Sequence, residues 1–215
     1  MSKKALIVSG GWDGHKPQEM AQLASSWLSE KNFTVDLKDT LDIFSDADAL
    51  KSYDLIVPNW TMGGLTGEQE QGLTAAIEAG TGLGGWHGGM GDAFRSNSNY
   101  QFMVGGQFVS HPDNEKDYEV AISKKDDPIV AGLSDFKVHS EQYYMHVDPA
   151  NEVLATTTFQ AKSTPWVNGT VMPVVWKKHW GAGRVFYSAL GHQPSVLDIP
   201  EAREIQIRGL LWASR

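Results

Sequence analysis

The first half of the chain alternates short apolar runs with segments whose apolar residues recur at helical spacing. Buried strands are predicted over residues 4–9, 33–37 and 54–58, and a fourth strand ends at Trp86. Between the first two strands, Pro17 suits the first turn of a helix. The apolar face of this helix is formed by Met20, Leu23, Ala24, Trp27 and Leu28. Thr66 and Gln69 have the spacing of a capping box, which predicts a helix that runs to Gly80.

In the second half of the chain, loops instead of helices separate the apolar runs. Strands are predicted over residues 118–122, 152–155, 173–176 and 185–190, with a turn over 177–184 and a closing helix over 201–212. The alternation in the first half predicts a parallel, doubly wound sheet, and the later strands predict an antiparallel edge. We therefore expect an α/β fold with a mostly parallel sheet. The segments 108–112 and 139–144 are expected to be irregular. They could cover a ligand-binding crevice at the edge of the sheet.

Composition and charge narrow the classes of function. A chain of 215 residues fits one domain over residues 1–215. The net charge of −8, without clusters of lysine and arginine, argues against nucleic acid and anionic membranes as partners. No apolar run is long enough to span a bilayer, and the N-terminal run reads as a first strand and not as a signal peptide. The absence of cysteine makes a cytoplasmic location the simplest expectation, while a homo-oligomer stays open.

Polar and aromatic residues follow the predicted strands where each strand ends. Ligands of open α/β sheets bind beyond the carboxyl ends of the strands. The residues at these positions are Trp12, Asp13, His15, Asn59, Trp60, His87 and His192. Three histidines from distant parts of the chain are thus predicted to meet at one edge, although His15 is equally well explained as a packed side chain. Trp12, Trp60 and Trp86 offer flat amphipathic faces that could stack on a sugar ring.

The segment GLGGWHGGMG, residues 82–91, surrounds His87 with glycines. Glycine tolerates the positive φ of a sharp strand-to-helix turn, and turns of this type often present a nucleophile. The serine of such turns is missing here and the chain has no cysteine, so acyl-enzyme chemistry is not expected. The alternative is a glycine-rich crossover with a packed histidine. If few neighbours touch the ring, replacing His87 by alanine costs about 1 kcal/mol of stability or less.

The remaining histidines and two further tryptophans are assigned structural positions. His139, His146 and His179 are expected to be half-buried side chains with satisfied partners. Trp27 and Trp212 lie on the apolar faces of predicted helices, so core packing is expected for both.

Five short motifs occur along nearly the whole chain: GWHGG at 85–89, VGGQFVSHP at 104–112, EQY at 141–143, GAGRVFY at 181–187 and GH at 191–192. In this order they resemble the ThuA-like (trehalose utilisation) family, whose flavodoxin-like fold belongs with the class I glutamine amidotransferase-like proteins. The resemblance implies site roles for His111, Glu141 and Tyr143. Because this chain has His139 and Ser140 where the family usually shows an Asp-Glu pair, only Glu141 is carried over as a candidate acid.

The resemblance also implies a role in sugar catabolism. In amidotransferase relatives the glycine-rich turn carries the cysteine nucleophile, and His87 takes that place here, so a cysteine-dependent glutaminase is not expected. The leading hypothesis is an enzyme that hydrolyses or isomerises a disaccharide, sugar derivative or keto-sugar by acid–base chemistry. Its expected catalytic residues are His87, His111, Glu141 and His192. The expected substrate-binding residues are Trp12, His15, Trp60, Trp86 and Tyr143.

Three alternatives to this hypothesis stay open. An ordinary glycosidase needs a second carboxylate, for which Asp13 and Asp92 are distant candidates. Several histidines with one carboxylate also suit a divalent metal such as zinc, but no short ligand motif is present. The alternative to an enzyme is a sugar-binding or regulatory protein that keeps the scaffold without catalysis. In every case the expected partner is a small carbohydrate.

Overall fold

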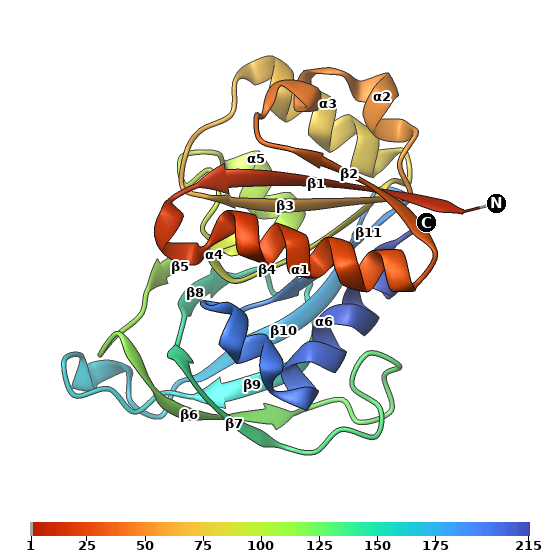
Figure 1. Ribbon diagram of the computed structural model, residues 1–215. Coiled ribbons are helices and arrows are strands. Elements are labelled where there is room, and N and C mark those ends of the chain that lie inside the picture. The colour runs from red at the N-terminus through yellow and green to blue at the C-terminus, as the bar shows by residue number, and fades with distance from the viewer. Residues whose placement is uncertain (1) are drawn as a thin grey trace.

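A nine-stranded sheet forms the centre of the computed structural model, which describes residues 2–215 (Figure 1). In spatial order its strands are β2 (Phe33–Lys38), β1 (Lys3–Gly11), β3 (Leu55–Thr61), β4 (Gly82–Trp86), β11 (Gly183–Ser188), β10 (Val171–Trp180), β9 (Glu152–Thr158), β6 (Glu115–Ile122) and β7 (Phe136–Glu141). The first five strands pair in parallel, and from β11 to β7 all pairs are antiparallel. This confirms the predicted α/β class with an antiparallel edge.

Helices cover both sides of the parallel half. One side carries α1 (Pro17–Glu30) and α6 (Pro200–Ala213), which lie below strands β1 and β3 in Figure 1. The opposite side carries α3 (Gly67–Glu78) and α5 (Ser98–Val104), which contact each other. Two short helices, α2 (Ala47–Lys51) and α4 (His87–Gly91), complete the set. The capping box predicted for α3 is present, because Thr66 and Gln69 satisfy each other's backbone N–H groups.

Two segments that we expected to be irregular form strands instead. Most of 108–112 belongs to β5 (Gly106–Ser110), and 139–144 is divided between β7 and β8 (Tyr144–Val147). β5 and β8 pair with each other as a separate two-stranded antiparallel sheet, with an irregular register between Phe108 and Ser110. The predicted turn over 177–184 is also shorter than expected, since β10 extends to Trp180.

The three histidines that we expected to be half-buried are exposed. His139, His146 and His179 lie on β7, β8 and β10, and their side chains point away from the core. His139 lies 2.8 Å from Asp117 on the neighbouring strand β6, where both side chains are open to solvent. Alternation along a strand places such residues on either face, and the sequence did not indicate which. Among residues 2–215, no helix is long and apolar enough to cross a membrane.

The apolar face of α1 should contribute strongly to stability. Trp27 is only 7% exposed there and belongs to the main hydrophobic core, as predicted. We expect Trp27→Ala to lower the free energy of unfolding by about 3–5 kcal/mol, because it leaves a cavity that neighbouring elements fill only in part. Urea denaturation measures this loss. Trp166, which is 79% exposed, provides the matched control, and its replacement by alanine should change stability by about 0.5 kcal/mol or less. Equal effects of the two substitutions would contradict the packing described here.

Candidate functional site

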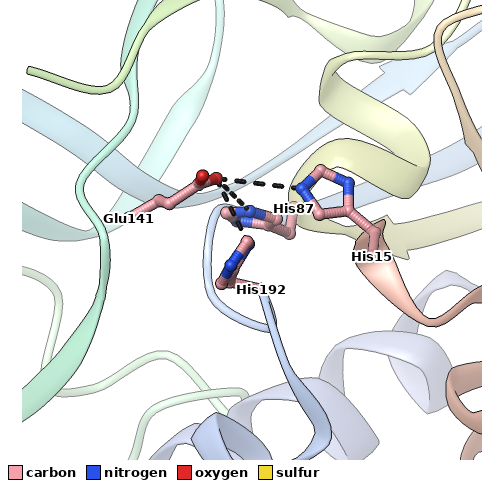
Figure 2. A group of neighbouring side chains, drawn as sticks. All are labelled: His15, His87, Glu141 and His192. Atoms are coloured by element: carbon pink, nitrogen blue, oxygen red, sulfur yellow. Dashed lines mark hydrogen bonds and ion pairs between the residues drawn. The ribbon is translucent and has the colours of Figure 1, made fainter. Parts of the chain in front are cut away.

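Three histidines meet at the carboxyl edge of the parallel strands, as the sequence predicted. His15 ends a short 3-10 helix, η1 (Asp13–His15), that follows β1. His87 follows β4 directly, and His192 lies shortly after β11. Glu141, the last residue of β7, comes from the far edge of the sheet and points toward all three rings (Figure 2). All four side chains are at least nine-tenths buried, and each offers one ligand atom within 4.8 Å of the others.

One oxygen of Glu141 is the common neighbour of the three imidazole rings. Oε2 of Glu141 lies 3.1 Å from Nε2 of His87 and 3.2 Å from Nδ1 of His192. Nε2 of His15 is 3.8 Å from the same oxygen. The facing nitrogens of His15 and His192 are buried and make no hydrogen bond within the described part of the chain. Two buried ring nitrogens therefore face a carboxylate oxygen without a hydrogen bond to it.

Each histidine is held in place through its other ring nitrogen. Nδ1 of His15 is 2.8 Å from the Thr61 hydroxyl, and Nδ1 of His87 donates to the carbonyl oxygen of Ala189 at 2.8 Å. Nε2 of His192 lies 3.3 Å from a carboxylate oxygen of Glu115. Partners of this kind fix the tautomer and the orientation of histidines that bind metal ions.

Proton placement at His87 leaves two acceptors facing each other. A carbonyl oxygen only accepts hydrogen bonds, so Nδ1 of His87 carries the proton toward Ala189. Burial lowers the pKa of His87 to about 4, against the opposing effect of its hydrogen bond with Glu141, so the ring is neutral at pH 7. Nε2 then presents a lone pair to Oε2 of Glu141 at 3.1 Å. A cation between the two atoms would satisfy both.

The charge on Glu141 is stabilised by its neighbours. Burial raises the pKa of this carboxyl group, but the nearby rings of His15, His192 and His87 outweigh burial and hold the pKa well below its usual range. Burial also lowers the pKa of His192, but the nearby Glu141 carboxylate outweighs burial and raises the pKa. Glu141 is thus an ionised carboxylate, which suits a ligand or a hydrogen-bond acceptor and not a proton donor.

The distances from the three ring nitrogens to Oε2 of Glu141 are near those around a small divalent cation. Around a tetrahedral zinc ion with bonds of about 2.0–2.2 Å, neighbouring ligand atoms are roughly 3.4 Å apart. The nitrogen-to-Oε2 distances of 3.1, 3.2 and 3.8 Å bracket that value. Three imidazoles and one carboxylate are also a donor set of the kind that zinc and related metals accept.

The glycine-rich turn brings these residues close together. His87 itself has φ of +40°, an uncommon conformation for a residue other than glycine, and it begins the one-turn helix α4. A Cβ atom on Gly88 would overlap the ring of His15. Glycine at this position therefore lets η1 lie against the turn, and the turn presents a histidine in the way that the sequence suggested.

A methyl group at this position should disrupt the cluster without unfolding the chain. We expect Gly88→Ala to displace the His15 ring and to weaken binding of zinc by about 10–100-fold, the range seen when support for a metal ligand is lost. Calorimetric titration with zinc measures the affinity, and circular dichroism checks the fold. Gly64→Ala is the matched control, since nothing lies within 4 Å of its added Cβ. Wild-type zinc affinity in the Gly88 variant would contradict the close approach of His15.

Two members of the cluster, His15 and Glu141, line a cavity of about 240 Å³. This cavity is lined by Trp12, His15, Met62, Asp92, Arg95, Phe108, His111, Glu141 and Tyr143. Nε2 of His111 lies 3.6 Å from the outer oxygen of Glu141, Oε1, and its side chain is one-third exposed. Tyr143 stacks on His87 with ring centres 3.9 Å apart. Trp12, 47% exposed, lies nearly perpendicular to the His15 ring, with ring centres 4.8 Å apart.

Two of the tryptophans expected to contact sugar lie elsewhere. Trp86 is 2% exposed and belongs to the hydrophobic core, so its faces are not available for stacking. Trp60 packs over Gly10 and Gly63 and does not line the cavity. Trp86 is the last residue of β4 and Trp60 the last but one of β3. Consecutive residues of a strand point to opposite sides, so a position near a strand end does not by itself decide whether the side chain reaches the cavity.

Met62, Arg95 and Phe108 line the cavity but were not among the predicted site residues. Asp92 was considered only as a second carboxylate, and the sequence signal that links it to Arg95 is their i,i+3 spacing just after the glycine-rich turn. A larger cavity of about 410 Å³ borders β6 and the end of β9. Its lining contains no histidine. The histidine–glutamate cluster lies instead beside the cavity of about 240 Å³.

The fold and the site define an α/β protein with a buried histidine–glutamate cluster at the carboxyl edge of its parallel strands. Residues 4–213 match the family ThuA, described as trehalose utilisation, and the chain belongs to this family. No curated protein matches the chain in sequence.

Solved structures agree with this assignment at the level of the fold. A ThuA-like protein from Parabacteroides merdae is 18% identical with a TM-score of 0.82, and the alignment covers 99% of this chain and 90% of that one. A ThuA-like protein from Bacteroides uniformis is 19% identical, with a TM-score of 0.80 and coverage of 98% and 91%. A cytoplasmic protein from Salmonella typhimurium LT2 is 14% identical, with a TM-score of 0.67 and coverage of 99% and 100%.

Proposed function

We propose that this protein is a divalent-cation-dependent enzyme that acts on a sugar derivative or keto-sugar. The observation that carries the proposal is the pair of facing acceptors, the neutral His87 ring and the ionised Glu141 carboxylate, within a cluster of three histidines. His15, His87, Glu141 and His192 would hold the cation. The family description, trehalose utilisation, supports a carbohydrate as the substrate.

The chain's own residues favour isomerisation over ordinary glycoside hydrolysis. A glycosidase uses two carboxyl groups, one of which donates a proton. Glu141 is held ionised, the Asp92 carboxylate is engaged by Arg95, and Asp13 is exposed outside the cavity. A proton shift beside a sugar carbonyl needs only one group that takes and returns a proton.

His111 is the residue that we assign to this proton transfer. It lines the cavity, is partly exposed, and lies at the outer oxygen of Glu141 instead of in the cluster. It would take the proton from the carbon beside the carbonyl, so that the C–H electron pair forms a C=C bond and the C=O π pair moves to the carbonyl oxygen to give an enediolate. The hydroxyl of the neighbouring carbon passes its proton to that oxygen, and His111 returns its proton to the former carbonyl carbon, which completes the shift. When bound, the cation supplies positive charge that polarises the carbonyl.

Exchange with deuterated water tests the proposed proton transfer. Zinc- or manganese-loaded protein is incubated with a panel of ketoses and oxidised glycosides in D₂O, and NMR follows deuterium at the carbon beside the carbonyl. We expect exchange that stops with a chelator and in the His111→Gln variant. His179→Gln, an exposed histidine on β10, is the control that should retain exchange. Sugar binding without exchange or turnover would favour the sugar-binding alternative.

The location and assembly of the protein stay predictions. A cytoplasmic location is proposed from the absence of cysteine, and the name of the Salmonella structure agrees with it. A homo-oligomer stays open, and the expected partner is a small carbohydrate.

A further inference from the structure

The wall of the cavity beside the cluster carries an ion pair that the proposed chemistry does not use. Asp92, 3% exposed, follows α4, and Arg95 lies three residues further along. Nε and Nη2 of Arg95 donate to the two oxygens of Asp92 at 2.5 and 2.8 Å. The guanidinium carbon lies 5.4 Å from the centre of the Phe108 ring. The pair is thus fixed on both sides, and both residues line the cavity with His111 and Glu141.

The pair offers hydrogen-bonding capacity in both directions. Within the described chain, Arg95 makes side-chain hydrogen bonds only through Nε and Nη2, so Nη1 is available as a donor. Each oxygen of Asp92 keeps a second lone pair as an acceptor. A hydroxyl group both donates and accepts, so two neighbouring hydroxyls on a ring can bond to Asp92 and Arg95 together. Because the two opposite charges compensate each other, this wall of the cavity is close to neutral.

We infer that Asp92 and Arg95 are the specificity-determining residues that bind two neighbouring hydroxyls of an uncharged sugar ring. The inference rests on the proposed function, because it places the ring in the same cavity as the cation cluster. Asp92 neutralises the positive charge of Arg95, so a negatively charged sugar would not be attracted by Arg95. The pair therefore selects neutral sugars over sugar acids.

The size and shape of the cavity agree with a single ring. Its volume of about 240 Å³ is below the roughly 300–1,000 Å³ of sites for drug-sized ligands. The half-exposed Trp12 lies at the same cavity and can cover one face of the ring. A second pocket of about 120 Å³ shares Arg95 and Phe108 with the first and is also lined by Gln101 and Gln107. A substituent on the bound ring has room there.

The charge of Asp92 provides the test. Asp92→Asn keeps the size of the side chain but leaves Arg95 with an uncompensated positive charge. The probes are D-glucose and D-galactose, each compared with its uronic acid, and calorimetry on zinc-loaded protein measures the affinities. We expect the ratio of uronate affinity to neutral-sugar affinity to rise at least about tenfold in the variant. The carboxylate of a uronate can also be attracted by the bound cation. This attraction is the same in variant and wild type, so it cancels when their affinity ratios are compared.

Arg95→Gln is the second variant, because the half-exposed Arg95 is less critical for folding than the buried Asp92. This variant should bind neutral sugars at least about tenfold more weakly than wild type, and its affinity for uronates should not increase. Both variants should bind zinc within about twofold of wild type, since neither residue belongs to the cluster. An unchanged affinity ratio in Asp92→Asn, or zinc-loaded wild type that binds none of the four sugars, overturns this inference and leaves the metal centre intact. If wild type binds no zinc, the proposed function fails, and the ratio measured on metal-free protein still decides the inference.

Discussion

Replacing Glu141 by glutamine is expected to weaken zinc binding by more than about 100-fold. The substitution keeps the side chain's size but removes the only negative charge among the four ligand atoms. Loss of a supporting residue costs metal sites about 10–100-fold, and loss of a charged ligand should cost more. Calorimetric titration of the purified variant with zinc measures the change.

Asp117→Asn is the matched control for this experiment. Asp117 is an exposed carboxylate on β6, the strand that pairs with β7, and it also contacts a histidine, His139. Its substitution should leave zinc affinity unchanged. If the Glu141 variant keeps wild-type affinity, the carboxylate is an acceptor for three histidines and not a metal ligand.

His87→Ala is expected to lower the free energy of unfolding of the metal-free protein by about 2–4 kcal/mol. The ring is 1% exposed, stacks on Tyr143 and donates to the Ala189 carbonyl. Its removal leaves a cavity and a buried carbonyl oxygen without that donor, and each contributes to the loss. Urea denaturation in the presence of a chelator measures it. Zinc should also stabilise the variant less than wild type, since a ligand stabilises a protein according to its affinity.

The exposed His139 on β7 is the control for the stability measurement. His139→Ala should change stability by about 0.5 kcal/mol or less. A loss of about 1 kcal/mol or less in His87→Ala would instead agree with the expectation from the sequence alone. That expectation assumed that a glycine-rich turn leaves the ring with few neighbours. The structure contradicts this assumption, because small residues allow Tyr143 and His15 to approach the ring closely.

The parallel half of the fold was predictable because its signals are local. Apolar runs, helical spacing and the Thr66–Gln69 capping box each depend on residues close in sequence, and all correspond to observed elements. The small sheet of β5 and β8 was not predicted. Its two strands are more than 30 residues apart in sequence, so no local signal links them. Their pairing also has an irregular register, and neither strand shows a clear alternation of apolar and polar residues.

The candidate site was predictable in part for the same reason. His15, His87 and His192 follow parallel strands, and parallel strands end at a common edge. Glu141 ends β7, the strand at the antiparallel end of the sheet, and its carboxylate nevertheless lies 3.1 Å from His87. Strand position alone could not place it, and its candidacy came from the family resemblance. Trp86 illustrates the reverse case, since a strand-end position did not reveal that its side chain points into the core.

Anomalous diffraction from crystals of the wild-type protein grown with zinc tests the central claim most directly. The account predicts a single strong peak among Nε2 of His15, Nε2 of His87, Nδ1 of His192 and an oxygen of Glu141, at about 2.0–2.2 Å from each atom. The result that would contradict it is a map with no zinc peak at the cluster and with Glu141 bonded directly to protonated histidines.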